Sequence, residues 1–347
     1  MDLAVNRRQM VLALLAAGAA GGLDLCADEP AGTTAPSGGS DSYSLREGTS
    51  ALFAGVTVTL HLQLAANAGP GTIVWRHATG PRTFSAGELA IDADALKSKT
   101  VAFSLRVPPI KDGVAFESAL EFTLGEMSLL RRTFWILPEN PFSDRKAWLE
   151  SLNLALFDPP GHTLKAFEKL EIGATRLTSL GALERVEKGI VILGEGLELS
   201  KFPALPSILS GLAQRGVSTI CLAPASGNWP DLSGGEIPPL ALRYERGRIV
   251  SELDKRLSVA AWPSPGMGFV PAVSRNGSVW QVGVEPRGWR WIEATHDKDT
   301  REIFCGFPLI AHWDADPTAR YLFARILEIL SEKSAKTLAA DKSKFGM

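Results

Sequence analysis

Three features that mark whole classes of protein are absent from this chain of 347 residues. It has only three cysteines, too few for the disulfide framework of a small secreted domain. Its formal net charge is −2, so it lacks the basic excess of proteins that bind nucleic acid. It also lacks a run of about 20 apolar residues, the length that crosses a bilayer. We therefore expect a globular protein with no nucleic-acid partner and no transmembrane segment in the mature chain.

The N-terminus has the organisation of an export signal. An arginine pair, Arg7–Arg8, precedes a short apolar run over Val11–Ala20 that is rich in Ala and Gly. The pair resembles the twin-arginine type of signal, which carries folded cargo, and ordinary secretion stays open because Asn6 and Met10 depart from that motif. We expect residues 1–27 to be the signal and the protein to act in the periplasm or cell envelope.

The next part of the chain changes composition and then period. Residues 28–47 are rich in Pro, Gly, Ser and Thr and are predicted to be a disordered linker. Apolar and polar residues then alternate over Val56–Leu64, which indicates a strand with one face on a core. Five further strands are expected over Thr72–His77, Thr83–Ala90, Thr100–Val107, Ala115–Leu124 and Leu129–Leu137.

Short strands at this spacing, with no helices between them, predict an immunoglobulin-like β-sandwich over residues 48–138. Two histidines, His61 and His77, fall in these strands and are interpreted as surface residues rather than ligands. No catalytic group of residues is recognised in this part.

A second pattern follows a linker at residues 139–149. We expect a strand over Gly189–Leu193, a helix over Pro203–Arg215 that Gly216 closes, and a strand over Val217–Ala223. Both strands are apolar runs, which is typical of strands buried on both faces. Alternation of this kind predicts a flavodoxin-like, doubly wound α/β domain over residues 150–333, followed by a flexible tail at 334–347.

Other elements complete that domain. Strands are expected over Leu152–Phe157, Ala174–Leu180, Val279–Glu285, Trp289–Ala294 and Glu302–Phe307. Helices are expected over Leu164–Leu170, with Thr163 as the cap, over Ala182–Lys188, and from Asp316–Thr318 onward. Residues 252–257 are predicted to be a charged turn and His296–Asp299 a polar hairpin turn.

Four segments carry a family resemblance. They are Gly189–Gly196 (GIVILGEG), Val217–Ala223 (VSTICLA), Ile303–Leu309 (IFCGFPL) and Asp316–Ala319 (DPTA). With them, residues 150–333 resemble the class I glutamine amidotransferase-like fold, in the non-catalytic form found as the trimerisation domain of certain β-galactosidases. The two-domain layout also resembles an exported bacterial family of unknown role.

The resemblance places three residues at the family's catalytic positions, namely Cys221 as nucleophile with His312 and Asp314. In active members glycines flank the nucleophile on a strained turn, whereas here Thr219 and Ala223 stand in their places. We therefore expect an incomplete triad, with Cys221 and the neighbouring-strand Cys305 as small buried residues. A hydrolase or amidotransferase that uses Cys221 is kept as the alternative.

A ligand is expected beyond the carboxyl ends of the parallel strands, where such sheets bind their ligands. The residues predicted to line this cleft are Asp158, His162, Gly194, Glu195, Gly196, Ser226, Asn228 and Trp313. No His/Cys spacing matches a zinc site, so neither a metal nor a cofactor is expected.

Tryptophans gather in the second half of the chain, at Trp229, Trp262, Trp289, Trp291 and Trp313. Their rings could stack on sugars, but Trp289 and Trp291, two residues apart on one strand, are interpreted as core residues. The sequence thus predicts a non-enzymatic binding or assembly protein of the cell envelope. Its partner is expected to be a protein or a carbohydrate, and a homo-oligomer stays open.

Overall fold

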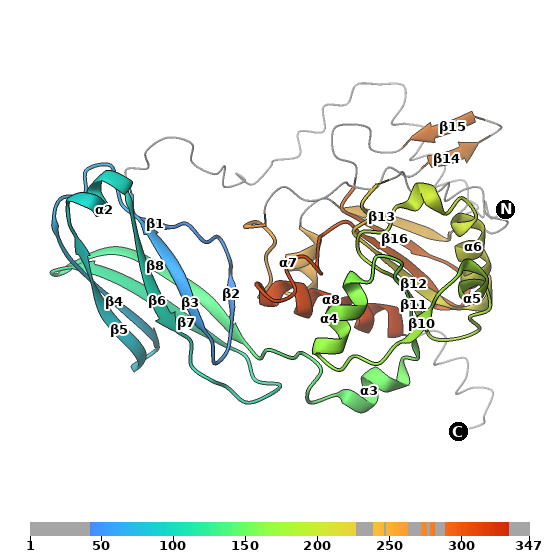
Figure 1. The fold of residues 1–347 in the computed structure, drawn as a ribbon, viewed down its shortest axis with the longest axis horizontal. Coiled ribbons are helices and arrows are strands. Elements are labelled where there is room, and N and C mark those ends of the chain that lie inside the picture. The colour runs from blue at the N-terminus through green and yellow to red at the C-terminus, as the bar shows by residue number, and fades with distance from the viewer. Residues whose placement is uncertain are drawn as a thin grey trace, which may run out of the picture. The chain divides into compact units, whose positions relative to one another are not determined.

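The computed structural model describes residues 42–226, 239–245, 248–262, 272–275, 278–281 and 289–332. The predicted signal, the predicted tail, Asn228 and Trp229 lie outside the described residues. The segment from Ser42 onward clusters into one compact unit. It joins an all-β part to a mixed α/β part (Figure 1), which confirms the predicted class of α/β plus all-β.

The all-β part contains two sheets. One sheet has the order β1 (Ser44–Leu45), β3 (Thr57–Gln63) and β6 (Thr100–Arg106). The other has the order β2 (Ala51–Phe53), β8 (Met127–Leu137), β7 (Phe116–Leu124), β4 (Gly71–Thr79) and β5 (Arg82–Ile91). The six strands expected from the alternating pattern are confirmed, with ends that differ by a few residues.

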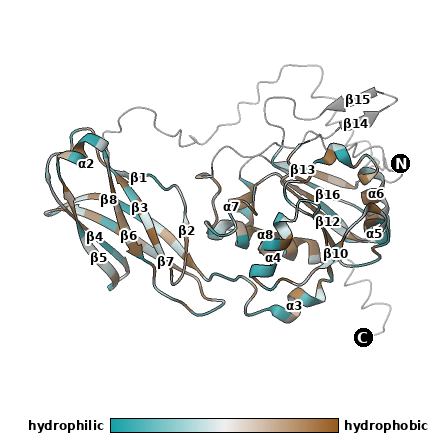
Figure 2. Cartoon of the chain, in the orientation of Figure 1, coloured by the Kyte–Doolittle hydropathy of each residue, from teal (hydrophilic) through white to brown (hydrophobic). Residues whose placement is uncertain are grey.

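The two sheets pack face to face around aromatic side chains. Phe103 of β6 lies 5.3 Å from Trp75 of β4 and 5.6 Å from Phe122 of β7, measured between ring centroids. Along β3, β4, β6 and β7 buried side chains alternate with more exposed ones, because one face of each sheet covers this core. Figure 2 shows both apolar and polar residues along these strands. The result is a sandwich of two sheets.

The sandwich differs from the prediction in three places. Ser44 and Leu45 form β1 inside the range predicted as linker, and Glu47 there pairs with His61. A short helix, α2 (Ala93–Ser98), lies between β5 and β6, and Asp92 caps it. The interpretation of His77 as a surface residue was wrong, because its side chain is fully buried against Ser118.

The α/β part is built on a seven-stranded sheet. Its order is β10 (Thr175–Leu177), β9 (Leu154–Phe157), β11 (Ile190–Leu193), β12 (Ser218–Leu222), β17 (Arg301–Cys305), β16 (Trp291–Thr295) and β13 (Ala241–Glu245). The first five strands run parallel, and the last two pair antiparallel. A separate hairpin joins β14 (Ala272–Arg275) and β15 (Ser278–Gln281).

Helices cover both faces of this sheet. One face packs against α4 (His162–Lys169) and α8 (Pro317–Ser331), and the other against α5 (Leu180–Glu184) and α6 (Leu205–Arg215). Shorter helices are α3 (Lys146–Ser151), η1 (Leu199–Lys201), α7 (Ile249–Leu253) and η2 (Asp297–Asp299). Every residue of β9, β11 and β12 is buried, which explains the continuously apolar sequences of β9 and β11.

Helix ends follow local signals. Gly216 closes α6 in the left-handed conformation with φ of 84°, and the Asp316 carboxylate accepts from the Thr318 amide at the start of α8. Both ends were predicted. The proposed Thr163 cap was wrong, because α4 starts before it and the Asp158 carboxylate accepts from the Leu164 amide.

Three more elements were missed between β12 and β16. Strands β13 and β14 were not predicted, and α7 covers part of the segment predicted to be a charged turn. The predicted hairpin turn at His296–Asp299 is confirmed, since η2 connects the antiparallel strands β16 and β17. No helix in the described part of the chain has the length and apolarity that a membrane crossing requires.

Candidate functional site

The parallel strands bring four loops to one edge of the sheet. Strands β9, β11, β12 and β17 are neighbours in that order, so their carboxyl ends lie side by side. We call the loops that follow them, residues 158–162, 194–196, 223–226 and 307–313, the strand-end loops. Their convergence follows from the strand order, as the sequence analysis expected.

Backbone hydrogen bonds join these loops directly. The Gly194 amide donates to the Phe157 carbonyl (2.9 Å), and the Gly196 amide donates to the Ala223 carbonyl (2.8 Å). Further along, the Leu199 amide donates to the Ser226 carbonyl (3.1 Å). The loop at residues 194–196 therefore lies between the loops after β9 and β12, and its backbone amides donate hydrogen bonds to both of them.

Glu195 occupies the centre of the strand-end loops. Its carboxylate accepts from the amides of Ile310 (2.7 Å) and Ala311 (2.9 Å), and its own amide donates to the Thr163 hydroxyl (2.9 Å). Burial raises the pKa of Glu195 to about 7, nearby Asp158 adds to the rise, and the two amides oppose it. The side chain predicted to bind a ligand is a bridge between loops of the protein itself.

Asp158 is buried beside Glu195. One carboxylate oxygen accepts from the Leu164 amide (2.8 Å), and the other has no hydrogen-bond partner among the described residues. The backbone of Gly194 passes so close that a Cβ there would lie 2.3 Å from Asp158 Oδ1. His162 begins α4 next to Gly196, whose hypothetical Cβ would be 3.9 Å from the imidazole. A glycine is needed at 194 for this close approach.

Cys221 is not placed as a nucleophile. Its thiol is 1% exposed on the sheet face covered by α5 and α6, and burial raises its pKa far above the ordinary range. Cys305 is also buried, and burial raises the pKa of its thiol to about 12. Both cysteines are therefore small buried core residues on neighbouring strands, as predicted.

The other two family positions are not brought to Cys221. His312 stacks on Trp262 with ring centroids 4.4 Å apart, and burial lowers its pKa. Asp314 pairs with Lys169 and Arg320, and its hydrogen bond with Lys169 is the main cause of its lowered pKa. Trp262 packs on the sheet face opposite to Cys221. The three residues therefore do not assemble into a triad.

Trp313 was predicted to offer a ring to a ligand, and this was wrong. Its side chain is 1% exposed and packs against Phe167 and Phe323. The Arg320 guanidinium, also buried, donates to its carbonyl (2.6 Å). Of the other tryptophans, Trp291 is fully buried as predicted, whereas Trp289 precedes the strand and packs with Tyr244 on the opposite face.

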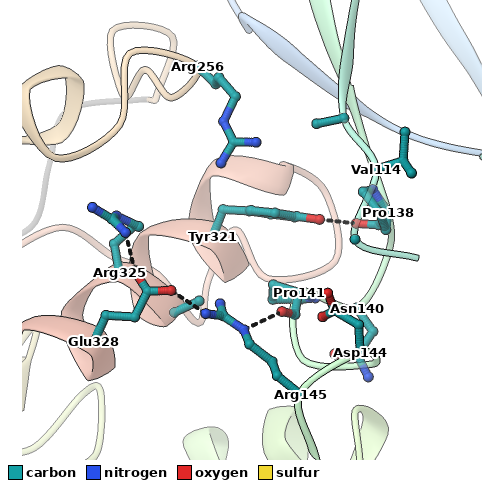
Figure 3. A pocket seen from close by; sticks show the side chains of 13 residues that line it. Val114, Pro138, Asn140, Pro141, Asp144, Arg145, Arg256, Tyr321, Arg325 and Glu328 are labelled. Carbon is teal, nitrogen blue, oxygen red and sulfur yellow. Dashed lines mark hydrogen bonds and ion pairs between the residues drawn. The ribbon is translucent and has the colours of Figure 1, made fainter. Parts of the chain in front are cut away.

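A pocket of about 220 Å³ lies elsewhere, where residues 113–115 and 138–145 meet α8. Figure 3 shows three arginines around it, Arg145, Arg256 and Arg325, with Tyr321 between them. Sequence reasoning missed this group because its members are far apart in the chain. The one local signal was the pair Arg325 and Glu328, a single turn apart on the closing helix.

Metal ligands do not gather in the part of the chain that the structure describes. No group of three or more His, Cys, Asp or Glu side chains there could hold an ion. The strand-end loops offer two carboxylates, Asp158 and Glu195, and the arginine pocket offers cations.

Comparison with known proteins names no family. No protein-family model and no curated protein matches the chain. A cycloisomaltooligosaccharide glucanotransferase from Paenibacillus sp., complexed with cycloisomaltoheptaose, matches at 10% identity over 54% of this chain and 28% of that chain, with a TM-score of 0.24. A 2,6-sialyltransferase from Vibrionaceae Photobacterium sp. JT-ISH-224 matches at 11% identity over 49% of this chain and 40% of that one, with a TM-score of 0.16. At these TM-scores neither likeness carries an argument, and this chain spans less than half the length of either protein.

Proposed function

We propose that this chain is an exported, non-enzymatic binding or assembly protein of the cell envelope. In this proposal an immunoglobulin-like sandwich precedes a flavodoxin-like domain of the non-catalytic amidotransferase-like kind. The domain presents a partner, a protein or a carbohydrate, with a rigid surface instead of a reaction centre. The Arg7–Arg8 pair and the apolar run after it support export, by the twin-arginine route or by ordinary secretion, and recovery of the protein in the cytosol of intact cells would contradict export.

The observation that carries the proposal is the position of Cys221. A thiol nucleophile must ionise and must reach both a base and the substrate. Cys221 is buried against α5 and α6, its pKa is raised, and its one described hydrogen bond is to the Leu222 carbonyl at 3.5 Å. A chain that relied on this residue for catalysis would need to expose it.

The strand order supports the domain assignment. The parallel strands, numbered by their order in the chain, are β9, β10, β11, β12 and β17. Across the sheet they lie in the order 2-1-3-4-5. This arrangement, with helices on both faces, is that of flavodoxin-like folds, in which the switch point lies between β9 and β11. The resemblance of Gly189–Gly196 and Val217–Ala223 to the amidotransferase-like pattern agrees with it.

The contacts of Glu195 support a role without catalysis. A general base must be free to reach a substrate proton. Both Glu195 carboxylate oxygens accept backbone amides of residues 310 and 311, and the loop backbones are joined to each other. At the carboxyl edge of the sheet, where such sheets bind their ligands, both oxygens of this carboxylate are engaged by the protein's own amides.

Labelling of native protein with iodoacetamide near pH 7 tests the proposal. We expect Cys221 to react only after unfolding, because the buried thiol stays protonated. A Cys305→Ala background removes the second buried thiol, so that labelling in the described core reports on Cys221. Met127→Cys is the matched control, since residue 127 is 56% exposed and its thiol should label readily in the folded protein. Labelling of native Cys221 as fast as that control would overturn the proposal.

A further inference from the structure

The arginine pocket is built by residues from separate parts of one compact unit. Arg145 precedes α3, Arg256 follows α7, and Arg325 lies on α8 beside Tyr321. The Tyr321 hydroxyl donates to the Pro138 carbonyl (3.2 Å), and burial raises its pKa above the ordinary range. Figure 3 shows the tyrosine ring lying among the arginine side chains.

Carboxylates hold the three guanidinium groups in place despite their like charge. Glu328 accepts from Arg145 with one oxygen and from Arg325 with the other. Asp254 accepts from Arg256 in a forked pair, with Nη2–Oδ2 and Nε–Oδ1 distances of 2.6 and 2.9 Å. Arginines fixed in this way lose little further freedom when they bind a ligand.

Hydrogen-bond donors remain on these arginines. A guanidinium carries five N–H donors, and the pairs with Glu328 and Asp254 use only some of them. The Nε of Arg325 also has no hydrogen-bond partner among the described residues, but it is buried, so the donors open to a ligand are those on the Nη atoms. Two N–H donors of one guanidinium match the two oxygens of a carboxylate.

The acceptors and the size of the pocket restrict the class of ligand that it can bind. Three guanidinium groups and two carboxylates, Asp144 and Glu328, line the pocket, and Asp254, which lies outside the lining, balances the charge of Arg256. Asp144 is exposed and can accept from hydroxyl or amino groups of a ligand. A volume of about 220 Å³ is below the 300–1,000 Å³ of sites for drug-sized ligands, so it suits a small molecule or one end group.

We propose that this pocket binds a carboxylate with neighbouring hydroxyl or amino donors, as in an acidic sugar or an amino acid. The carboxylate pairs with the guanidinium groups of Arg325 and Arg256, and the donors of the ligand pair with Asp144. The inference rests on the binding role proposed above, and it assigns that role a ligand class and a position.

Calorimetric titration of the full-length protein tests the pocket, with D-glucuronate, L-glutamate, D-glucose and inorganic phosphate as separate probes. We expect glucuronate or glutamate to bind, and whichever binds identifies the sugar or the amino acid as the source of the carboxylate. Arg325→Gln should weaken this binding at least about tenfold, the effect of losing one charge-assisted hydrogen bond. Arg243→Gln is the matched control, because Arg243 is similarly exposed, pairs with Glu252, and does not line the pocket.

Other results would overturn the inference. They are no binding of either acid, binding of phosphate alone, glucose binding as tight as glucuronate, or equal affinity in Arg325→Gln and the control. If Arg325→Gln does not fold, Arg325→Lys keeps the charge but loses the fork, and it should still weaken binding. If no acid binds and native Cys221 does not label, only the inference about this pocket is contradicted. If native Cys221 labels readily, the proposed function is contradicted, whatever the titration shows.

Discussion

One ionisable group in the sandwich and one in the strand-end loops have pKa values that burial shifts in opposite directions. In the sandwich, burial lowers the pKa of His77 to about 4. In the strand-end loops, burial raises the pKa of Glu195 to about 7. Both shifts favour the neutral form, because a charge loses its hydration when it leaves water.

The comparison predicts opposite effects of pH on the two parts. A histidine with a lowered folded pKa contributes stability that is present above about pH 6.5 and is lost as pH falls toward 4. A glutamate with a raised folded pKa contributes stability that is present below about pH 4.5 and is lost as pH rises toward 7. Between these limits each group opposes the other, so single substitutions are needed to separate them.

The largest expected effect comes from crowding the α/β side. Gly194→Ala places a Cβ 2.3 Å from Asp158 Oδ1, so the Asp158 side chain must move and release the Leu164 amide. We expect a loss of about 3 kcal/mol in the free energy of unfolding, from overpacking and a lost cap. Urea denaturation measures it.

Gly181→Ala is the matched control for this change. Gly181 lies in α5, and a Cβ there would meet nothing within 4 Å. Because alanine favours helix, this variant should be as stable as the parent or slightly more stable. Equal stability of the two alanine variants would show that the contact between residues 194 and 158 does not constrain the loops.

A smaller effect is expected on the sandwich side. The Ser118 hydroxyl lies 2.9 Å from His77 Nε2 and donates to the Phe134 carbonyl (3.3 Å). Ser118→Ala leaves the buried imidazole without this partner, and we expect a cost of about 2 kcal/mol. Thermal unfolding measures it, and Ser98→Ala on the exposed helix α2 is the control. If the Ser118→Ala variant were as stable as its parent, the hydrogen bond between His77 and Ser118 would not contribute to the stability of the sandwich.

The smallest effect is the pH dependence carried by Glu195. Glu195→Gln removes the titration and keeps the shape, so the parent should lose about 1 kcal/mol relative to the variant between pH 4.5 and 7. The figure is below the full shift because Glu195 keeps part of its surface in water. Denaturant midpoints at several pH values measure it. A parent that gains stability over this interval, relative to Glu195→Gln, would contradict the raised pKa.

Local sequence determined most of the elements and the place where the loops meet. Alternating residues gave the strands of the sandwich, continuously apolar runs gave the central parallel strands, and Gly216 and Asp316 marked helix ends. These signals are short in range, since a strand or cap depends on residues a few positions apart. The same periodicity could have predicted that His77 is buried. His77 is two residues from Trp75 in β4, so both side chains point to the core side of the strand.

Tertiary structure alone decided what the polar residues do. Glu195 meets amides more than a hundred positions away, so its bridging role has no local signal. Trp313 follows a strand end, yet the packing of Phe167 and Phe323 buries it. The arginine pocket joins α8 to residues 113–115 and 138–145, and only the folded chain brings its charges together. Sequence determines which residues can form an element. Contacts between distant elements determine which polar groups bond within the protein and which can still bind a ligand.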